Sequence, residues 1–284
     1  MSSQKGMASV SQREFAFNDK DFMRVKQLVY DFAGIDLNDS KRNLVYNRLA
    51  KRIRFLEQNS FRQYLDYVEA QGEAEFVHLI NAITTNLTFF FRENHHFEYL
   101  AQEVIPYLLE ANAQHKKIRL WSAGCSTGEE PYSLAIILKE TVPAGWDARV
   151  LATDLDTNVV ETGQTGVYKI DRLKGVSQER KKRWFLKGSG RHEGMVRVKP
   201  ELQEIIDFGQ INLMHDWPIK EQIDVIFCRN VVIYFDKPTQ AKLFQRYADL
   251  LPNHGYLFVG HSESLYKVSD RFKLLGQTIY RKIQ

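Results

Sequence analysis

The sequence predicts an α/β domain that follows a small all-helical unit and contains a small antiparallel insertion. Apolar residues recur at helical spacing from about residue 21 to 84, with no strand signal among them. From about residue 100, short apolar runs alternate with helical patterns, as in a mostly parallel sheet covered on both faces. A basic, glycine-containing stretch over about residues 171–205 breaks this alternation and indicates an insertion.

Composition narrows the function classes. The 284 residues are 44% apolar and 26% charged, which excludes a disordered chain. No apolar run reaches the roughly 18 residues of a membrane-spanning helix, and residues 1–15 are expected to form a flexible polar tail. The net charge of +4 is mild, so it does not by itself point to a nucleic-acid role. Cys125 and Cys228 are too few for a disulfide framework or a zinc site, so we expect no metal and a reducing, cytoplasmic location.

The N-terminal unit, residues 16–90, is expected to hold four helices. The first places Phe22, Val25 and Val29 on one stripe and ends near Gly34. The other three are expected over residues 40–57, 61–70 and 74–84.

The second unit, residues 91–284, is expected to hold five strands. The last is expected to be antiparallel, because little chain separates it from its predecessor. In the insertion, glycines followed by the alternating run Met195–Val198 predict a hairpin or small sheet. The strands are expected over residues 118–122, 150–153, 223–228, 256–260 and 278–282.

The strongest local motif, IRLWSAGCSTGEEPY at residues 118–132, predicts a strand, a small-residue turn and a helix. Gly124 and Gly128 permit a tight turn with close approach of a ligand, and Ser126 or Thr127 is expected to cap the helix. The spacing differs from the Gly-x-Gly-x-x-Gly of dinucleotide folds, and two acids at the helix start disfavour a pyrophosphate. The alternative is an ordinary strand–helix turn.

Asp154 ends the next predicted strand, where an acid is placed to accept hydrogen bonds from ribose hydroxyls. The alternative role is a helix cap, which fits Asp156 better. Taken together, the turn and Asp154 suggest a nucleoside ligand without a pyrophosphate, such as S-adenosylmethionine.

Three further segments carry polar side chains. In DVIFCRNVVIYFD, residues 224–236, Arg229, Asn230 and Tyr234 follow a strand and are expected near the ligand. Cys228 has no base beside it and is expected to be a buried residue rather than a nucleophile. TTNLTFFFRENHH, residues 84–96, has no clean period, so its spacing alone indicates a linker packed on the core.

The third segment is a basic helix. Arg48, Lys51 and Arg52 share one face, and no acid occurs between Asp39 and Glu57. Such a face either is simply solvated or docks an acidic partner, and no aromatic residues interleave to favour nucleic acid.

These motifs, with GHSES at residues 260–264, resemble in order the chemotaxis receptor methyltransferases of the CheR family over about residues 20–282. The resemblance implies a Rossmann-like S-adenosylmethionine-dependent methyltransferase domain with a small all-α N-terminal domain and a small antiparallel β-subdomain. It also implies methylation of receptor glutamates, with S-adenosylhomocysteine as product and a monomeric enzyme. The cofactor contacts it implies are Asn86, Thr88, Arg92, Glu129, Asp154, Asn212, Leu213, Arg229 and Asn230.

The resemblance also suggests roles in the reaction. Arg92 would pair the methionine carboxylate, Glu129 would accept from its ammonium group, and Tyr234 would orient the incoming glutamate. The basic helix would contact the cytoplasmic domain of the receptor. Some family members dock a pentapeptide from the receptor C-terminus as an added strand, and the insertion resembles that type through Gly188, Gly190 and Gly194.

Other interpretations remain open at this point. One is a methyltransferase that acts on RNA or on a different protein. Another is a non-catalytic cofactor-sensing module, although intact Asn86, Arg92 and Asp154 argue for retained cofactor binding. A nucleotide-binding oxidoreductase is the weakest, because the Gly-x-Gly-x-x-Gly motif is missing.

Overall fold

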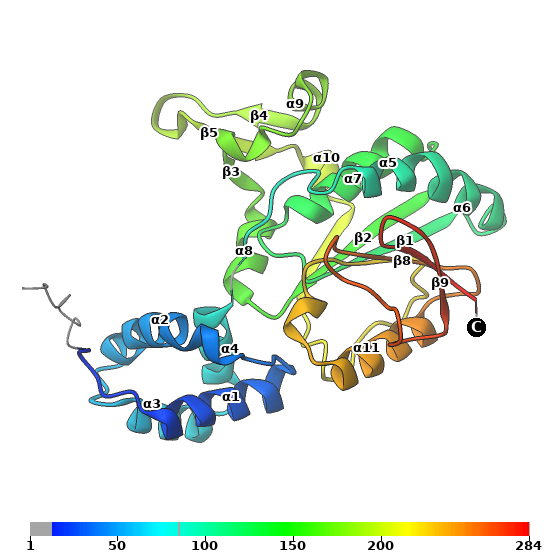
Figure 1. Ribbon diagram of the computed structural model, residues 1–284. Coiled ribbons are helices and arrows are strands. Elements are labelled where there is room, and N and C mark those ends of the chain that lie inside the picture. Colours follow the sequence, from blue (N-terminus) through cyan, green and yellow to red (C-terminus); the bar gives the residue numbers. More distant parts are fainter. Residues whose placement is uncertain (1–12, 85, 284) are drawn as a thin grey trace, which may run out of the picture.

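The computed structural model describes residues 13–84 and 86–283. Figure 1 shows three parts: a helical unit in blue, a sheet with flanking helices, and a small sheet that projects from one side. Within the described ranges, no helix is long and apolar enough to cross a membrane.

The four expected N-terminal helices are confirmed, with bounds shifted by one or two residues. α1 begins at a capping box formed by Asn18 and Asp21, and it ends at Gly34 with φ 68°. Ser60 caps α3 by accepting a hydrogen bond from the Gln63 N–H at 3.2 Å. The elements are α1 (Asp19–Ala33), the 3-10 turn η1 (Asp39–Lys41), α2 (Arg42–Phe55), α3 (Phe61–Gln71) and α4 (Glu73–Ile83).

Residues 1–12 of the expected tail lie outside the described part of the chain. Arg13 and Phe15, at its end, contact α2. The Arg13 guanidinium donates to Asn43 Oδ1 at 2.7 Å, and the Phe15 N–H donates to the Tyr46 hydroxyl at 3.3 Å.

The main sheet has seven strands in the order β6-β2-β1-β7-β8-β10-β9. The first five are parallel, and β10 runs antiparallel to β8 and β9, so the expected antiparallel closure is confirmed. The strands are β1 (Lys117–Ala123), β2 (Asp147–Asp154), β6 (Ile206–Gln210), β7 (Val225–Cys228), β8 (Tyr256–Val259), β9 (Phe272–Gly276) and β10 (Ile279–Lys282).

The sequence pattern missed β6 and β9, which are the two edges of the sheet. An edge strand has a neighbour on one side only, so its sequence need not be continuously apolar. In β9, Leu274 and Leu275 are exposed, and β6 carries Asp207 and Gln210.

Helices cover both faces of the sheet, and β1 shows how its side chains alternate. Leu120 packs on one face with Leu134 of α7, while Trp121 packs on the other face with Tyr247 of α11 at 5.5 Å between ring centroids. The core of the N-terminal helices is continuous with the α11 face. The covering helices are α5 (His95–Tyr99), the π-helical turn η2 (Leu100–Val104), α6 (Ile105–Ala111), α7 (Glu129–Thr141), α8 (Thr157–Thr165) and α11 (Lys237–Leu250).

The insertion forms a separate three-stranded antiparallel sheet in the order β3-β5-β4, at the top of Figure 1. Its first strand begins at Val167, before the expected start at about residue 171. Met195–Val198 is the central strand, so only β3 and β4 have free edges. Its elements are β3 (Val167–Lys169), η3 (Ile170–Leu173), α9 (Gln178–Trp184), β4 (Phe185–Lys187), η4 (Gly190–His192), β5 (Met195–Val198) and α10 (Pro200–Gln203).

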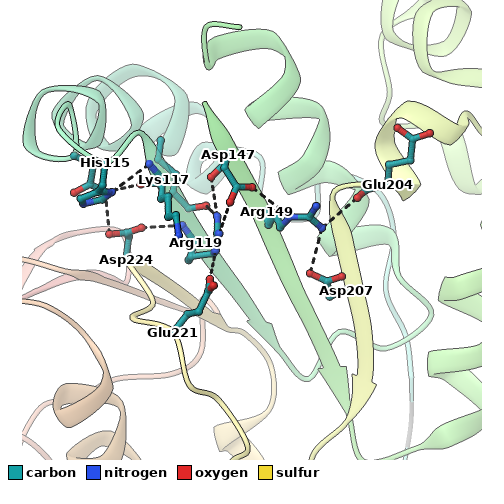
Figure 2. A network of polar contacts seen from close by, with 11 residues as sticks. His115, Lys117, Arg119, Asp147, Arg149, Glu204, Asp207, Glu221 and Asp224 are labelled. Carbon is teal, nitrogen blue, oxygen red and sulfur yellow. Dashed lines mark hydrogen bonds and ion pairs between the residues drawn. The ribbon is translucent and has the colours of Figure 1, made fainter. Parts of the chain in front are cut away.

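A polar network ties the amino ends of the parallel strands together (Figure 2). Arg119 of β1 donates to the Asp147 carbonyl at 2.7 Å and pairs with the carboxylates of Asp147 and Glu221. Asp224, just before β7, accepts from the Arg119 N–H at 2.7 Å. These contacts pair the charged groups at this end of the sheet, so we infer that this end stabilises the fold. The candidate functional side chains lie at the opposite end.

Candidate functional site

A pocket opens at the carboxyl ends of β1, β2, β6 and β7. The chain runs from β1 outward to β2 and β6 and then returns to β7 on the other side of β1, so strand order reverses there. Such a switch point is where parallel sheets form ligand sites. The sequence-predicted residues that line the pocket are Asn86, Thr88, Arg92, Asp154, Asn212, Leu213, Arg229, Asn230 and Tyr234.

The N-terminal unit closes the other side of the pocket. Ala33 and Ile35, at the end of α1, and Ile80 of α4 contribute apolar surface to its lining. Ile35 also forms a β-bridge with Phe235, and the Asp36 N–H donates to the Tyr234 carbonyl at 2.8 Å. The pocket is therefore built between the two units, and the sequence pattern of either unit alone contains only part of it.

The turn after β1 is fixed by its backbone geometry. Gly124 has φ +95°, and a Cβ there would lie 2.4 Å from Cγ2 of Val231. A Cβ at Gly128 would lie 2.8 Å from the Cα of Gly163. Other parts of the chain therefore pack closely against both glycines, and the close approach of a ligand there stays a prediction.

The expected cap at Ser126 or Thr127 is wrong. α7 follows Gly128, which is left-handed with φ 95°, and no side chain caps the helix. The Thr127 hydroxyl instead donates to Oε2 of Glu129 at 2.6 Å. Ser126 has φ 50° and uses its backbone N–H to donate to Asp154.

Asp154 lies at the end of β2 and joins two loops. Its Oδ2 accepts from the Ser126 N–H at 2.8 Å, and its Oδ1 accepts from the Asp156 N–H at 3.0 Å. Burial raises the pKa of Asp154 to about 6, although these N–H groups favour the ionised form. Asp154 lines the pocket, and its carboxylate has further acceptor capacity beyond these two bonds.

Asp156 has the capping role expected for it. Its Oδ1 accepts from the Asn158 N–H at 2.9 Å at the start of α8, and its Oδ2 accepts from Asn86 Nδ2 at 2.9 Å. Asn86 therefore links the segment before the sheet domain to the loop after β2.

The two acids at the start of α7 have different surroundings. Glu130 lines the pocket, where it accepts from the Ser122 hydroxyl at 2.7 Å and lies 3.3 Å from Nη1 of Arg229. Glu129 is fully buried outside the lining, and its Oε1 lies 3.4 Å from Nη1 of Arg172. Burial raises the pKa of Glu130, and Arg229 opposes that rise. Glu130 was not among the expected cofactor contacts, although it is the second acid of the Gly-Glu-Glu-Pro run that also contains Glu129.

The burial of individual side chains in residues 86–92 explains why this segment has no clean period. Phe90 and Phe91 are buried, whereas Leu87 and Phe89 are 70% and 46% exposed beside the pocket. Arg92 Nη1 donates to the Leu87 carbonyl at 2.8 Å. The segment is both a linker and a wall of the pocket.

Arg229 forms the centre of a buried charged group in the wall of the pocket. Its side chain is 2% exposed and donates to the Arg92 carbonyl, and its Nη2 lies 3.4 Å from Oε2 of Glu93. Burial opposes ionisation of Glu93, but the charge of Arg229 holds the pKa of Glu93 below its usual value. With Glu93 and Glu130 on either side, Arg229 is balanced by two carboxylates.

Asn212 and Leu213 follow β6. Asn212 Nδ2 donates to the Phe32 carbonyl at 2.7 Å and its Oδ1 accepts from the Met214 N–H at 3.0 Å, so this side chain joins α1 to the sheet domain. The Leu213 carbonyl accepts from Arg246 Nη1 at 2.6 Å. Both polar atoms of the Asn212 side chain thus have partners within the chain, and Leu213 contributes an apolar surface.

The basic face of α2 is not free. Arg52 forms a two-point pair with Glu75, and Arg48 donates to the Ala82 and Thr84 carbonyls. Arg48 and Arg52 are half-buried, and the acid that pairs Arg52 comes from α4, far along the sequence. Docking of a partner on the face shared with Lys51 stays a prediction. Lys51 is exposed.

Gly188, Gly190 and Gly194 lie between β4 and β5 in the small sheet, on the connection that crosses from one strand to the next. They lie outside the pocket lining. Gly190 and Gly194 have φ 57° and 78°, a left-handed backbone that favours glycine.

Both cysteines are free and buried, as expected. Burial raises the pKa of Cys125 and Cys228, which argues against a thiolate nucleophile. Within residues 13–84 and 86–283, no group of three or more His, Cys, Asp or Glu side chains could hold a metal ion.

The lining suits a zwitterionic nucleoside. Asp154 places a hydrogen-bond acceptor after β2, while Glu130 and Arg92 supply both signs of charge elsewhere on the wall. Apolar Ile211 and Leu213 lie after the next strand. A pyrophosphate would meet the acidic start of α7, so the residues fit S-adenosylmethionine and disfavour a dinucleotide. The fold and the pocket define an S-adenosylmethionine-dependent methyltransferase of the Rossmann-like class.

The comparisons with known proteins agree. The family model "CheR methyltransferase, all-alpha domain" matches residues 20–84, and "CheR methyltransferase, SAM binding domain" matches residues 86–281. The chemotaxis protein methyltransferase of Salmonella typhimurium is 45% identical over 96% of this chain and 93% of its own length. Chemotaxis protein methyltransferase 2 of Pseudomonas aeruginosa is 44% identical over 94% of this chain and 95% of its own length.

A third relative, the chemotaxis protein methyltransferase of Escherichia coli K12, is 44% identical over 93% of this chain and 91% of its own length. The chain therefore belongs to the CheR methyltransferase family.

Proposed function

We propose that this methyltransferase transfers the methyl group of S-adenosylmethionine to glutamate side chains in the cytoplasmic domain of chemoreceptors, forming glutamate methyl esters. The observation that carries the proposal is that every acid on the pocket wall is already engaged. Asp154 accepts two backbone N–H groups, Asp156 caps α8, and Glu130 lies between Ser122 and Arg229.

A pocket whose acids already have hydrogen-bond or ion-pair partners offers no free base in the described part of the chain, which fits a carboxylate as the methyl acceptor. The lining contains no histidine or lysine among the described residues. An amine acceptor would need a group to take its proton, whereas a glutamate with a usual pKa of about 4.3 is already ionised at neutral pH. The protein then has to orient the acceptor and exclude water, and orientation of this kind can contribute several kcal/mol, up to about 7–11.

S-adenosylmethionine, when bound, supplies an electrophilic methyl group on a sulfonium. Asp154 would accept from the ribose hydroxyls, and Arg92 would pair the methionine carboxylate. Glu130 would accept from the ammonium group, because it lines the pocket where Glu129 does not. Glu129 would act from behind by holding Thr127 and Arg172 in place.

Other residues would support the cofactor or the acceptor. Asn212 would contact the adenine through its backbone, because its side chain is occupied, and Leu213 would pack against the ring. Asn86, Thr88, Arg229 and Asn230 would complete the wall. Tyr234 would orient the incoming carboxylate, since its hydroxyl has no hydrogen bond to any residue in the described ranges and its ring lines the pocket.

The rim of the pocket suits an acidic amphipathic segment. Leu87 and Phe89 line the pocket and are 70% and 46% exposed. Ile233, next to the lining residue Tyr234, is 49% exposed. Basic side chains bind the carbonyls of the same rim segment: Arg92 that of Leu87, and Arg172 that of Thr88 at 2.7 Å. Apolar groups framed by arginines fit a helix whose apolar face is flanked by glutamates.

We propose two more contacts with the receptor. Lys51, exposed on α2, would attract the acidic receptor at longer range. A receptor pentapeptide would pair with a free edge of the small sheet, β3 or β4, because β5 already has a neighbour on each side. Gly188, Gly190 and Gly194 would permit close approach beside β4.

The test uses methyl-labelled S-adenosylmethionine and a receptor cytoplasmic fragment. Methyl esters release volatile methanol in base, so we expect base-labile volatile label from this fragment. A matched fragment with glutamine at every candidate glutamate should give none. Label that stays with the protein after base treatment, or that appears on RNA, would show a different acceptor.

A further inference from the structure

The loop that follows β7 carries much of the pocket wall. Five of its side chains line the pocket: Arg229, Asn230, Val231, Tyr234 and Phe235. The loop belongs to no ladder of the main sheet, and it contains one short 3-10 turn, η5 (Val232–Tyr234). Its buried backbone groups therefore need partners from elsewhere, and those partners decide where the lining side chains lie.

Glu263, which belongs to the GHSES motif at residues 260–264, accepts hydrogen bonds from backbone N–H groups of this loop. Its side chain is buried, with the residue 4% exposed. Oε2 accepts from the Asn230 N–H at 2.9 Å and from the Gly260 N–H, and Oε1 accepts from the Ile233 N–H at 3.2 Å. One carboxylate thus joins the ends of β7 and β8.

Gln240 of α11 satisfies the carbonyls of the same loop. Its Nε2 donates to the Val232 and Phe235 carbonyls, at 2.9 Å each. Two N–H groups of the loop thus donate to Glu263 and two of its carbonyls accept from Gln240. The remaining contacts are the Tyr234 and Phe235 N–H groups, which bond within the loop, and the Tyr234 carbonyl, which accepts from Asp36.

The geometry at Asn230 makes the loop sensitive to this contact. Asn230 has φ 59°, a left-handed conformation that asparagine adopts more readily than most non-glycine residues and that its surroundings must still fix. A Cβ at Gly260 would lie 2.4 Å from Asn230 Nδ2 and 2.8 Å from its N. Asn230 is therefore packed closely against the backbone of Gly260 and hydrogen-bonded to the carboxylate of Glu263.

We propose that Glu263 is a positioning residue for methyl transfer, which holds Asn230 and Tyr234 in their places on the pocket wall through backbone N–H groups. It touches no cofactor in this role; it acts through the loop. A carboxylate is suited because it has acceptors on both oxygens, whereas an amide would turn one of them into a donor facing an N–H. The role of Tyr234 in this inference rests on the proposed function.

The test is Glu263→Gln, which keeps the shape of the side chain. We expect the amide signals of Asn230, Ile233 and Gly260 to shift upfield and broaden in nitrogen–proton spectra, because charge-assisted hydrogen bonds are lost. With the receptor fragment, kcat should fall at least tenfold. Affinity for S-adenosylhomocysteine, measured by calorimetry, should fall by less, because Asp154 and Leu213 lie on other strands.

Asp224→Asn is the matched control. Asp224 is also a buried carboxylate that accepts a backbone N–H, from Arg119 at 2.7 Å, but it lies at the opposite end of β7 (Figure 2). We expect this variant to lower the melting temperature while leaving kcat and the three amide signals unchanged.

Unchanged kcat and amide signals in Glu263→Gln would overturn the proposal, as would an equal loss of kcat in Asp224→Asn. If the wild-type chain methylates no receptor fragment, the proposed function fails, and the amide signals still test Glu263. If Glu263→Gln does not fold, the wild-type spectrum decides: downfield amides at Asn230 and Gly260 support the proposal, and amides at ordinary positions contradict it.

Discussion

Arg52 of α2 and Glu75 of α4 form a two-point pair, with Nε 2.9 Å from Oε1 and Nη2 2.6 Å from Oε2. The Glu75 carboxylate is 4% exposed and the Arg52 side chain 20% exposed. The pair turns the most prominent charge cluster of the sequence into an internal brace of the helical unit.

Removing the arginine should therefore destabilise the protein. Arg52→Ala leaves a buried carboxylate unpaired, and we expect the free energy of unfolding in denaturant to fall toward the lower end of about 3–5 kcal/mol, because water reaches Arg52. Lys51→Ala, on the exposed side, should change stability by less than about 0.5 kcal/mol. An Arg52 variant of normal stability with a raised KM for the receptor would support the docking role instead.

Gly124→Ala should displace the loop after β7, because the new Cβ would lie 2.4 Å from Val231 Cγ2. We expect at least tenfold weaker binding of S-adenosylhomocysteine by calorimetry, about 1.4 kcal/mol. Adding Val231→Ala should recover part of the loss. Gly145→Ala is the control, because Gly145 has φ +87° and no atom within 4 Å of its Cβ position; weakening of the same size there would contradict the steric explanation.

Cofactor affinity should fall as the pH falls through about 6. The pKa of Asp154 is raised to about 6, so acid protonates this carboxyl group and removes the acceptor that we propose for the ribose hydroxyls. The affinity should be full above this pH and drop by up to about tenfold per unit below it. Calorimetry from pH 5 to 8 measures this. Asp154→Asn should bind weakly at every pH; a wild-type pH profile in that variant would assign the titration to another group.

His96 should make the fold less stable in acid. It is fully buried, its Nε2 bonds the Gln277 carbonyl at 2.8 Å, and burial lowers its pKa to about 4. A histidine in the unfolded chain gains its proton near pH 6.5. Stability from His96 is therefore present above that pH and lost as the pH falls toward 4, by at most about 1.4 kcal/mol per unit.

The comparison of wild type with His96→Gln isolates this effect, because a glutamine can keep a donor near Gln277. Denaturant unfolding at pH 7 and pH 5 should show a smaller acid loss in the variant. Equal losses in both proteins would mean that other groups cause the acid sensitivity.

The sequence by itself determined the elements whose pattern is local. The helical period gave four N-terminal helices, and buried apolar runs gave the five inner strands, because burial on both faces leaves a continuous apolar signal. The turn after β1 and Asp154 after β2 were placed at one sheet edge, because parallel strands end together. The motif set identified the family.

The tertiary structure alone decided which polar groups meet. Arg52 and Glu75 are 23 residues apart, Asn212 reaches back to Phe32, and Glu263 joins the loop after β7 to the loop after β8. No periodicity encodes such pairs, because each is set by how separate elements pack. Edge strands β6 and β9 were missed for the related reason that their stability comes from a neighbouring strand rather than from their own composition.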